Sequence, residues 1–192
     1  MKKLKTCFLL IFISLFNFNS NAQADKLLEW ANQGSVKNQN YHSEIPFRYV
    51  NGYIFIDIIQ NNKKYNFLFD TGAEATLLDN SIINEFDFKP CSTSNMSGPL
   101  ITNGDVSTIS LSAIKLADVE FLDIGAVSFD LSAFKSKFCE KIDGVIGNNL
   151  LKKAKWQIDY KNQVIGLSNN ISNLIPEKPK YTITTNLPKK GW

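Results

Sequence analysis

The sequence predicts an all-β barrel with one or two short helices, and three observations support that class. Short apolar or alternating runs recur through most of the chain. Turn residues separate these runs, which is typical of barrels built from many short strands. Asn51-Gly52 stands between two such runs, 46–50 and 53–59, and this dipeptide favours the left-handed turn of a β-hairpin.

The other elements follow in chain order. A short helix is expected from Asp25 to Asn32, with Asp25 as its cap and Gly34 as its stop. A polar stretch over 37–43 follows it, and 61–64 forms a turn before the strand 65–69. The same patterns predict a short helix over 81–86, strands over 106–116, 119–121 and 126–129, a helical turn over 131–138, and a closing hairpin of 155–160 and 163–167.

Residues 1–24 have the features of a signal peptide. Three lysines among the first five residues precede an apolar run from Phe8 to Phe16, and Ala22-Gln23-Ala24 supplies small residues for cleavage. The run is too short to span a bilayer as a stable helix, so we expect export without a stable membrane anchor. The protein would then be periplasmic or secreted, and a retained anchor is the alternative.

Beyond residue 24 the chain carries no formal net charge. Removing residues 1–24 removes three of the 21 basic residues and none of the 18 acidic ones. No basic patch remains that would indicate nucleic-acid binding. The remainder has the length of one domain with a substantial core. We divide it into a polar leader (25–43), the domain (44–168) and an Asn-, Pro- and Lys-rich tail (169–192), from which a second, similar lobe could follow.

Two cysteines and one histidine lie beyond the signal peptide. In an exported protein Cys91 and Cys139 can form a disulfide, which would tie the loop after the first helix of the domain to the segment before Asp143. Two free thiols are the alternative. His42 is the only histidine, so neither a metal cluster nor a Ser-His-Asp triad has enough parts. We therefore expect no metal and no cofactor.

The most informative segment is an apolar strand that runs directly into Asp70-Thr71-Gly72 and is followed by Ala73. A carboxylate at the end of a buried strand is costly to desolvate unless hydrogen bonds compensate it. Gly72 allows the backbone to turn tightly beside Asp70, and Thr71 supplies a hydroxyl that can hold the loop. This arrangement is typical of an acid used in catalysis.

A second motif, Asp143-Gly144-Val145-Ile146-Gly147, leads into Asn148-Asn149-Leu150-Leu151, and its Gly147 follows Asp70 by 77 residues. Together the two motifs resemble those of the retropepsin-like aspartic peptidases, over about Ile45 to Leu167. The resemblance implies an acid-protease barrel lobe in which Asp70 is catalytic. It also implies that Thr71, Gly72 and Ala73 support the active-site loop and that the second motif packs behind this loop.

The resemblance also implies an activity and partners. Aspartic peptidases use two carboxylates facing one water, but this chain has a single Asp-Thr-Gly. The second Asp would come from a homodimer mate or from a second lobe. The expected function is an exported endopeptidase that acts on peptides or proteins, and a non-catalytic module that binds a peptide or a partner protein is the alternative. Residues 91–105 occupy the place of the family's flap, the hairpin over the substrate, with an ordinary surface loop as the alternative.

Three positions refine these expectations. Where retroviral enzymes carry an Arg paired with an acid near the catalytic loop, this chain has Asn148, so we expect Glu74 to be exposed or bonded differently. Asp143 is expected to cap or orient its loop. Ala73 cannot donate a hydrogen bond where many acid-adapted relatives carry Ser or Thr, which predicts an optimum at mildly acidic to neutral pH. The apolar neighbours of the two motifs are expected to be core residues: Phe67, Phe69, Leu77, Val145 and Ile146.

Overall fold

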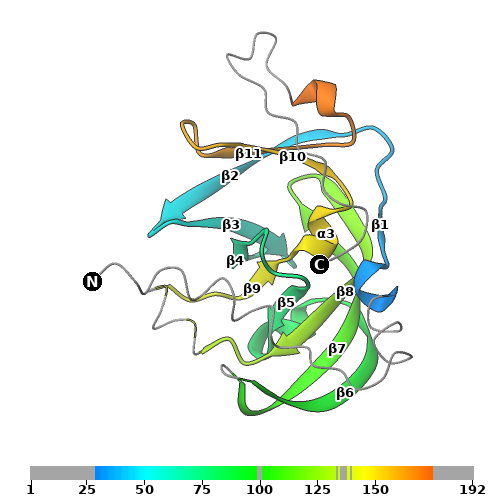
Figure 1. Ribbon diagram of the computed structural model, residues 1–192. Coiled ribbons are helices and arrows are strands. Elements are labelled where there is room, and N and C mark those ends of the chain that lie inside the picture. The colour runs from blue at the N-terminus through cyan, green and yellow to red at the C-terminus, as the bar shows by residue number, and fades with distance from the viewer. Residues whose placement is uncertain (1–28, 99–100, 133, 135–137, 139, 175–192) are drawn as a thin grey trace.

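The computed structural model describes residues 29–98, 101–132, 134, 138 and 140–174, and these form a single large β-sheet with short helices (Figure 1). The strands are β1 (Ser35–Val36), β2 (His42–Val50), β3 (Tyr53–Gln60), β4 (Lys63–Phe69), β5 (Thr76–Asp79), β6 (Phe88–Gly98), β7 (Ile101–Leu116), β8 (Val119–Phe129), β9 (Gly144–Ile146), β10 (Lys155–Asp159) and β11 (Val164–Ser168). The helices are the 3-10 helices η2 (Asn80–Glu85) and η3 (Ile171–Asn173), the α-helix α3 (Asn148–Leu151) and a helical turn at 29–32. The described residues 132, 134 and 138 are also helical, within the helical turn predicted over 131–138. The predicted all-β class is confirmed.

The strands are hydrogen-bonded in the order β10-β11-β2-β3-β4-β9-β5-β8-β7-β6, and β1 pairs with β8 outside this path. β2 changes partner along its length, because residues 42–46 pair with β11 and residues 47–50 pair with β3. This switch attaches the closing hairpin β10–β11 to the rest of the sheet, and that hairpin lies where the sequence predicts it. Figure 1 shows β2, β10 and β11 at one end of the molecule and the β6–β7 hairpin at the other.

The first two turns contain asparagines with a left-handed backbone conformation, that is, a positive φ. Asn51 and Gly52, between β2 and β3, have φ of 53° and 89°. Asn61 and Asn62, between β3 and β4, have φ of 51° and 59°. Two successive residues with positive φ match the right-handed twist of the strands that they join. Both predicted turns are therefore confirmed, although Lys63 and Lys64 already belong to β4.

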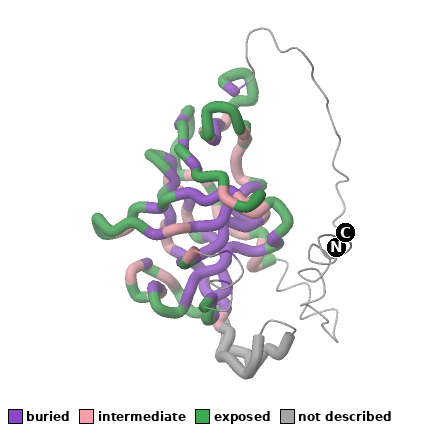
Figure 2. Tube along the Cα trace, turned by 90° about the vertical axis from the view of Figure 1, so that its left-hand side faces the viewer, coloured by how far each residue is buried: buried purple, intermediate pink, exposed green. Residues whose placement is uncertain are grey.

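Buried side chains form two clusters, one on each face of the central strands, and Figure 2 shows the buried residues concentrated in the middle of the molecule. On β4, Phe67 and Phe69 point to the larger cluster, whereas Leu68 points to the smaller one. Phe55 on β3 also belongs to the smaller cluster. A strand covered on both faces needs a continuous apolar run, which explains why the residues before Asp70 do not alternate with polar ones.

Two strand predictions were wrong in extent. Residues 119–121 and 126–129 belong to one strand, β8, because its antiparallel register with β7 continues from Ser107↔Ser128 to Leu116↔Val119. Asp123 takes a left-handed φ of 52° within β8 without shifting that register. Residues 91–98 and 101–105 belong to β6 and β7 and most of them pair across the β6–β7 hairpin, so the surface-loop alternative does not hold for them. A hairpin is the form that the flap expectation requires.

The polar leader lies against the barrel. Its predicted helix is present at 29–32, and Gly34 follows with a left-handed φ of 93°. β1 then pairs with β8, and β2 begins at His42. The predicted signal peptide (1–24), Asp25 and the tail beyond Leu174 lie outside the described residues. Among the described residues, no helix is long and apolar enough to cross a membrane.

Candidate active site

The two motifs meet in the centre of the sheet. β9, from the second motif, lies between β4 and β5, the strands that enter and leave the Asp70 loop. It runs parallel to β4, with Phe69 opposite Ile146, and antiparallel to β5, with Leu77 opposite Val145. The second motif therefore supports the Asp70 loop from behind through backbone pairing on both sides.

Asp70 is held by backbone groups at the end of β4. Its amide donates to the Ile146 carbonyl at 3.1 Å, and its carboxylate Oδ1 accepts the Gly72 N–H at 2.8 Å. Asp70 is half-buried, while Thr71 and Gly72 are exposed at the tip of the loop. Gly72 does not have a left-handed φ, so its contribution is the N–H that orients the carboxylate rather than an unusual backbone conformation.

The back of the loop is bound to the start of α3. Ala73 is buried, and its carbonyl accepts the Asn148 N–H at 2.6 Å. The Glu74 carbonyl accepts the Asn149 N–H at 3.1 Å. These amides stand in the first turn of a helix, where they lack partners inside the helix, so the loop carbonyls satisfy them. Glu74 itself is exposed, as expected because Asn148 stands where retroviral enzymes carry the Arg that would pair with this acid.

Gly147 is required by a close approach between the motifs. A Cβ atom at this position would lie 2.3 Å from both the carbonyl carbon and the carbonyl oxygen of Ala75. Backbone atoms cannot move aside as a flexible side chain can, so only glycine fits between β9 and α3.

Asn149 is a supporting residue that the sequence analysis did not identify. Its Oδ1 accepts hydrogen bonds from both the amide (2.9 Å) and the hydroxyl (3.0 Å) of Thr76, and its Nδ2 donates to the Gly125 carbonyl at 2.6 Å. Asn149 is 3% exposed and Thr76 is 0% exposed. The sequence signal for this contact was one polar residue next to apolar ones in each of two segments, Thr76 before Leu77 and Asn149 before Leu150. Buried polar side chains need partners, so the two could have been paired.

Asp143 orients the start of β9. Its Oδ2 accepts the Asn66 N–H at 2.8 Å, and its own amide donates to the Asn66 carbonyl at 2.8 Å. Lys141 Nζ lies 2.6 Å from Oδ1, and the hydrogen bond to Asp143 raises the pKa of Lys141. Four residues of extended strand, or about 13 Å, separate Asn66 from Asp70. Asp143 therefore lies beside the middle of β4, whereas Asp70 follows the C-terminal end of this strand, and Asp143 cannot be its catalytic partner.

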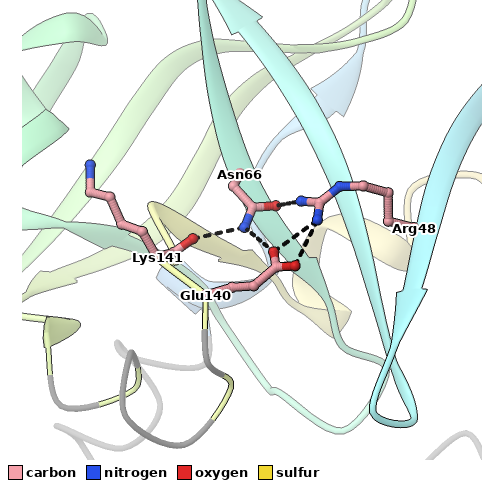
Figure 3. Close-up of polar contacts among 4 residues, drawn as sticks. All are labelled: Arg48, Asn66, Glu140 and Lys141. Carbon is pink, nitrogen blue, oxygen red and sulfur yellow. Dashed lines mark hydrogen bonds and ion pairs between the residues drawn. The ribbon is translucent and has the colours of Figure 1, made fainter.

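A second polar network attaches the segment before β9 to the sheet (Figure 3). Arg48 Nη1 donates to both carboxylate oxygens of Glu140, at 2.8 and 2.9 Å, and its Nη2 donates to Asn66 Oδ1 at 2.9 Å. Asn66 Nδ2 in turn donates to the Lys141 carbonyl at 2.7 Å. Asn66 thus connects β2, β4 and the chain entering the second motif.

The remaining candidate residues lie as follows. The apolar residues that flank the motifs are buried, as expected for core residues: Phe67, Phe69, Leu77, Val145 and Ile146. Cys91 is exposed on β6 and has no disulfide partner among the described residues. Cys139 lies outside the described residues, so the disulfide stays a prediction for the oxidised protein.

Comparison with known families agrees with this geometry. Residues 56–150 match the model of a family described as aspartyl protease, and this span contains both motifs. The fold and the two-motif site define an aspartic peptidase lobe. By this match, residues 56–150 belong to the aspartyl protease family.

Solved structures resemble parts of the chain. A retropepsin-like aspartic protease from Rickettsia conorii is 23% identical, with a TM-score of 0.45, over 69% of this chain and 95% of that one. Basic 7S globulin from soybean is 9% identical, with a TM-score of 0.35, over 67% of this chain and 42% of the globulin. A retroviral protease-like domain from Leishmania major is 13% identical, with a TM-score of 0.31, over 56% of this chain and 81% of that domain. A comparison with curated proteins gives no match.

Proposed function

We propose that this chain is an exported aspartic endopeptidase in which Asp70 pairs with a second Asp from a homodimer mate or a second lobe. One observation carries the proposal. The Asp70 carboxylate is oriented by the Gly72 N–H on a loop whose tip is exposed and whose back is bonded to the second motif. A carboxylate held in this way can face a second one across an interface without rearrangement of its own loop.

The proposed chemistry follows from two such carboxylates close together. Two carboxyl groups at short distance do not both ionise, because their negative charges would repel each other. The pair therefore shares one proton. The ionised member takes a proton from a water molecule, and the water oxygen forms a bond to the peptide carbonyl carbon. The protonated member donates to the carbonyl oxygen. The C–N bond then breaks as the carboxyl that took the proton from water gives it to the amine nitrogen, and the other carboxylate takes back the hydroxyl proton as the carbonyl re-forms. The pH dependence of this step belongs to the pair rather than to either residue.

The second carboxylate has to come from outside the described lobe. The chain has one Asp-Thr-Gly, and Asp143 is bonded to Lys141 and to Asn66 in the middle of β4. Thr71, Gly72 and Glu74 are exposed beside Asp70, so the loop offers a surface for a second copy.

Mixing experiments test the pairing. If two copies share the site, specific activity should rise with protein concentration, and an excess of Asp70→Asn should lower it beyond simple dilution because mixed dimers have one carboxylate. Activity that is independent of concentration and unaffected by Asp70→Asn would contradict the dimer. Asp57→Asn, on the exposed side of β3, is the matched control.

A non-catalytic module that binds a peptide or a partner remains the second candidate, because the lobe has one Asp-Thr-Gly and lacks the Arg of the retroviral enzymes at Asn148. A pepstatin-type inhibitor separates the two functions. It should raise the melting temperature of an assembled dyad, but not that of a lobe without one.

Export is proposed from residues 1–24 alone. Expression of the full chain followed by cell fractionation and N-terminal sequencing tests it. Recovery of an unprocessed chain in the cytoplasm would contradict export.

A further inference from the structure

The N-terminal segment 29–38 occupies the part of one β8 edge that does not pair with β5, the strand after the Asp70 loop. β7 pairs along one edge of β8, from Val119 to Ser128. On the other edge the short strand β5 pairs only with residues 126–129, and β1 pairs with Phe121 and Leu122. β1 and β5 therefore share one edge of β8, and segment 29–38 continues the sheet where the strand after the Asp70 loop stops.

Several contacts attach this segment along β8 and β7. The Lys37 amide donates to the Glu120 carbonyl at 2.9 Å, and the two side chains form an ion pair at 2.5 Å. A Cβ at Gly34 would lie 2.7 Å from the Leu122 carbonyl oxygen, so the segment approaches β8 at backbone distance. Gln33 Nε2 donates to the Ser110 hydroxyl on β7 at 3.0 Å. The segment is therefore bonded at intervals along its length.

Trp30, near the start of this segment, lies against Gly125, which directly precedes the residues of β8 that pair with β5. Its indole Nε1 donates to the Ile109 carbonyl at 3.0 Å. A Cβ at Gly125 would lie 2.6 Å from the Trp30 carbonyl oxygen and 3.1 Å from the indole Cε2. Trp30 also packs against the smaller hydrophobic cluster, which contains Ala73 and Ala75 of the active-site loop.

Gly125 links Trp30 to the buried Asn149. The Gly125 carbonyl accepts the Asn149 Nδ2 at 2.6 Å, and Asn149 Oδ1 holds both polar groups of Thr76. A displaced Gly125 would leave a buried amide donor without its partner, which is unfavourable enough to move the side chain. Thr76 is the first residue of β5, so such a movement reaches the end of the Asp70 loop.

We propose that segment 29–38 is a brace of the active-site loop, and that Trp30 is a positioning residue that acts through Gly125 and Asn149 on Thr76. The role in catalysis rests on the proposed peptidase function, whereas the role in holding the loop does not. The family match begins at residue 56, so the brace lies outside the matched span.

Two substitutions test the brace. Gly125→Ala inserts a methyl group against Trp30 and leaves the Trp30 side chain intact, and Trp30→Phe removes the indole donor to Ile109. Gly166→Ala is the matched control, because its Cβ would meet the flexible end of Leu174 at 2.9 Å on β11, remote from the loop. Trp30→Phe decides the question if Gly125→Ala does not fold.

Amide hydrogen exchange is the first readout and needs no activity. We expect the Thr76 and Asn149 amides to exchange at least about tenfold faster in both test variants than in Gly166→Ala, after correction for global stability, because their local openings become easier. Equal protection of these amides in the test and control variants would overturn the brace.

Kinetics is the second readout. A small misplacement of a catalytic group can cost roughly 100-fold in rate, so we expect kcat to fall roughly 10- to 100-fold in the test variants, with KM changing less than about threefold. An unchanged kcat would overturn the catalytic role of the brace. If the wild-type chain cleaves nothing, the proposed function fails, and the exchange result still decides whether the brace holds the loop.

Discussion

Asn149 and Thr76 share a two-point contact in which one amide oxygen accepts both the backbone N–H and the side-chain hydroxyl of the threonine, at 2.9 and 3.0 Å. Both residues are buried, and Thr76 directly follows the Asp70 loop. The contact joins α3, which follows the second motif, to the strand that leaves the first motif. It therefore fixes the separation of the two motifs at the point where the backbone pairing of β9 has ended.

Asn149→Ala should destabilise the protein by about 3 kcal/mol, because it removes the Asn149 hydrogen bonds of three buried polar groups on Thr76 and Gly125, and the Thr76 hydroxyl then keeps only the Gly147 N–H at 3.4 Å. Urea unfolding measures the change. Asn148→Ala is the control, since the backbone amide of Asn148 makes the contact to Ala73 and remains in the variant. Its cost should stay within about 1 kcal/mol. Equal losses in the two variants would contradict the role assigned to the Asn149 side chain.

Asp143→Ala should cost about 2–3 kcal/mol. The substitution leaves the Asn66 N–H without its acceptor and removes the partner of Lys141, whose side chain is mostly exposed and can rehydrate. Chemical denaturation of this variant beside Asp57→Ala gives the comparison. Asp57 pairs with Lys64 at 3.0 Å on the surface, so its loss should cost less than about 1 kcal/mol. A surface-like value for Asp143→Ala would show that Asp143 does not hold β9.

Gly147→Ala should destabilise by about 3 kcal/mol and shift the Asp70 loop, because the new methyl group meets the backbone of Ala75. Gly52→Ala separates the steric cost from the cost of backbone conformation. Gly52 has a φ of 89° but no atom within 4 Å of its added Cβ, so we expect a loss of about 1–2 kcal/mol there. Thermal or urea unfolding that ranks Gly52→Ala as the more damaging change would contradict the close approach.

Ala73→Ser should move the pH optimum of cleavage downward by about one unit. A serine hydroxyl beside the dyad can donate a hydrogen bond to its ionised form, and a hydrogen bond to a charged group contributes about 1.5 kcal/mol. Rate profiles of the two proteins between pH 3 and 8 provide the measurement. Ala73→Gly, which adds no donor, should leave the optimum in place. An optimum that does not move in Ala73→Ser would remove the reason given for activity at mildly acidic to neutral pH.

Local signals made much of the fold predictable. Asn51-Gly52 and Asn61-Asn62 mark turns through their tolerance of positive φ, and the uninterrupted apolar run before Asp70 marks a strand that is buried on both faces. The two motifs identify the strands that meet at the site, because the Asp70 carboxylate, the Gly72 N–H that orients it and the closely packed Gly147 are needed there.

The other features of the fold and site depend on contacts between residues far apart in the sequence, so local patterns did not predict them. Residues 91–98 form a strand because they pair with β7, and β8 stays continuous because it also pairs with β7. The hairpin at 91–105 was expected only from the family resemblance, and neither pairing has a local signature. The leader docks through backbone contacts, Trp30 and polar side chains such as Gln33 and Lys37, so its polar composition did not indicate that it lies against the sheet. The role of Asn149 could not be predicted because Asn148 precedes it in the sequence. Only the direction of each side chain in α3 distinguishes the buried Asn149 from the half-exposed Asn148.

Cleavage of a mixed peptide library by the chain from residue 25 onward, between pH 3 and 8, tests the central claim most directly. Asp70→Asn is measured beside it at the same micromolar concentration. The account predicts cleavage by the wild-type chain, with an optimum at mildly acidic to neutral pH, and none by Asp70→Asn. Cleavage that persists in Asp70→Asn would contradict the assignment of Asp70, and no cleavage by either protein would contradict the proposal that two copies of this chain form an active dyad.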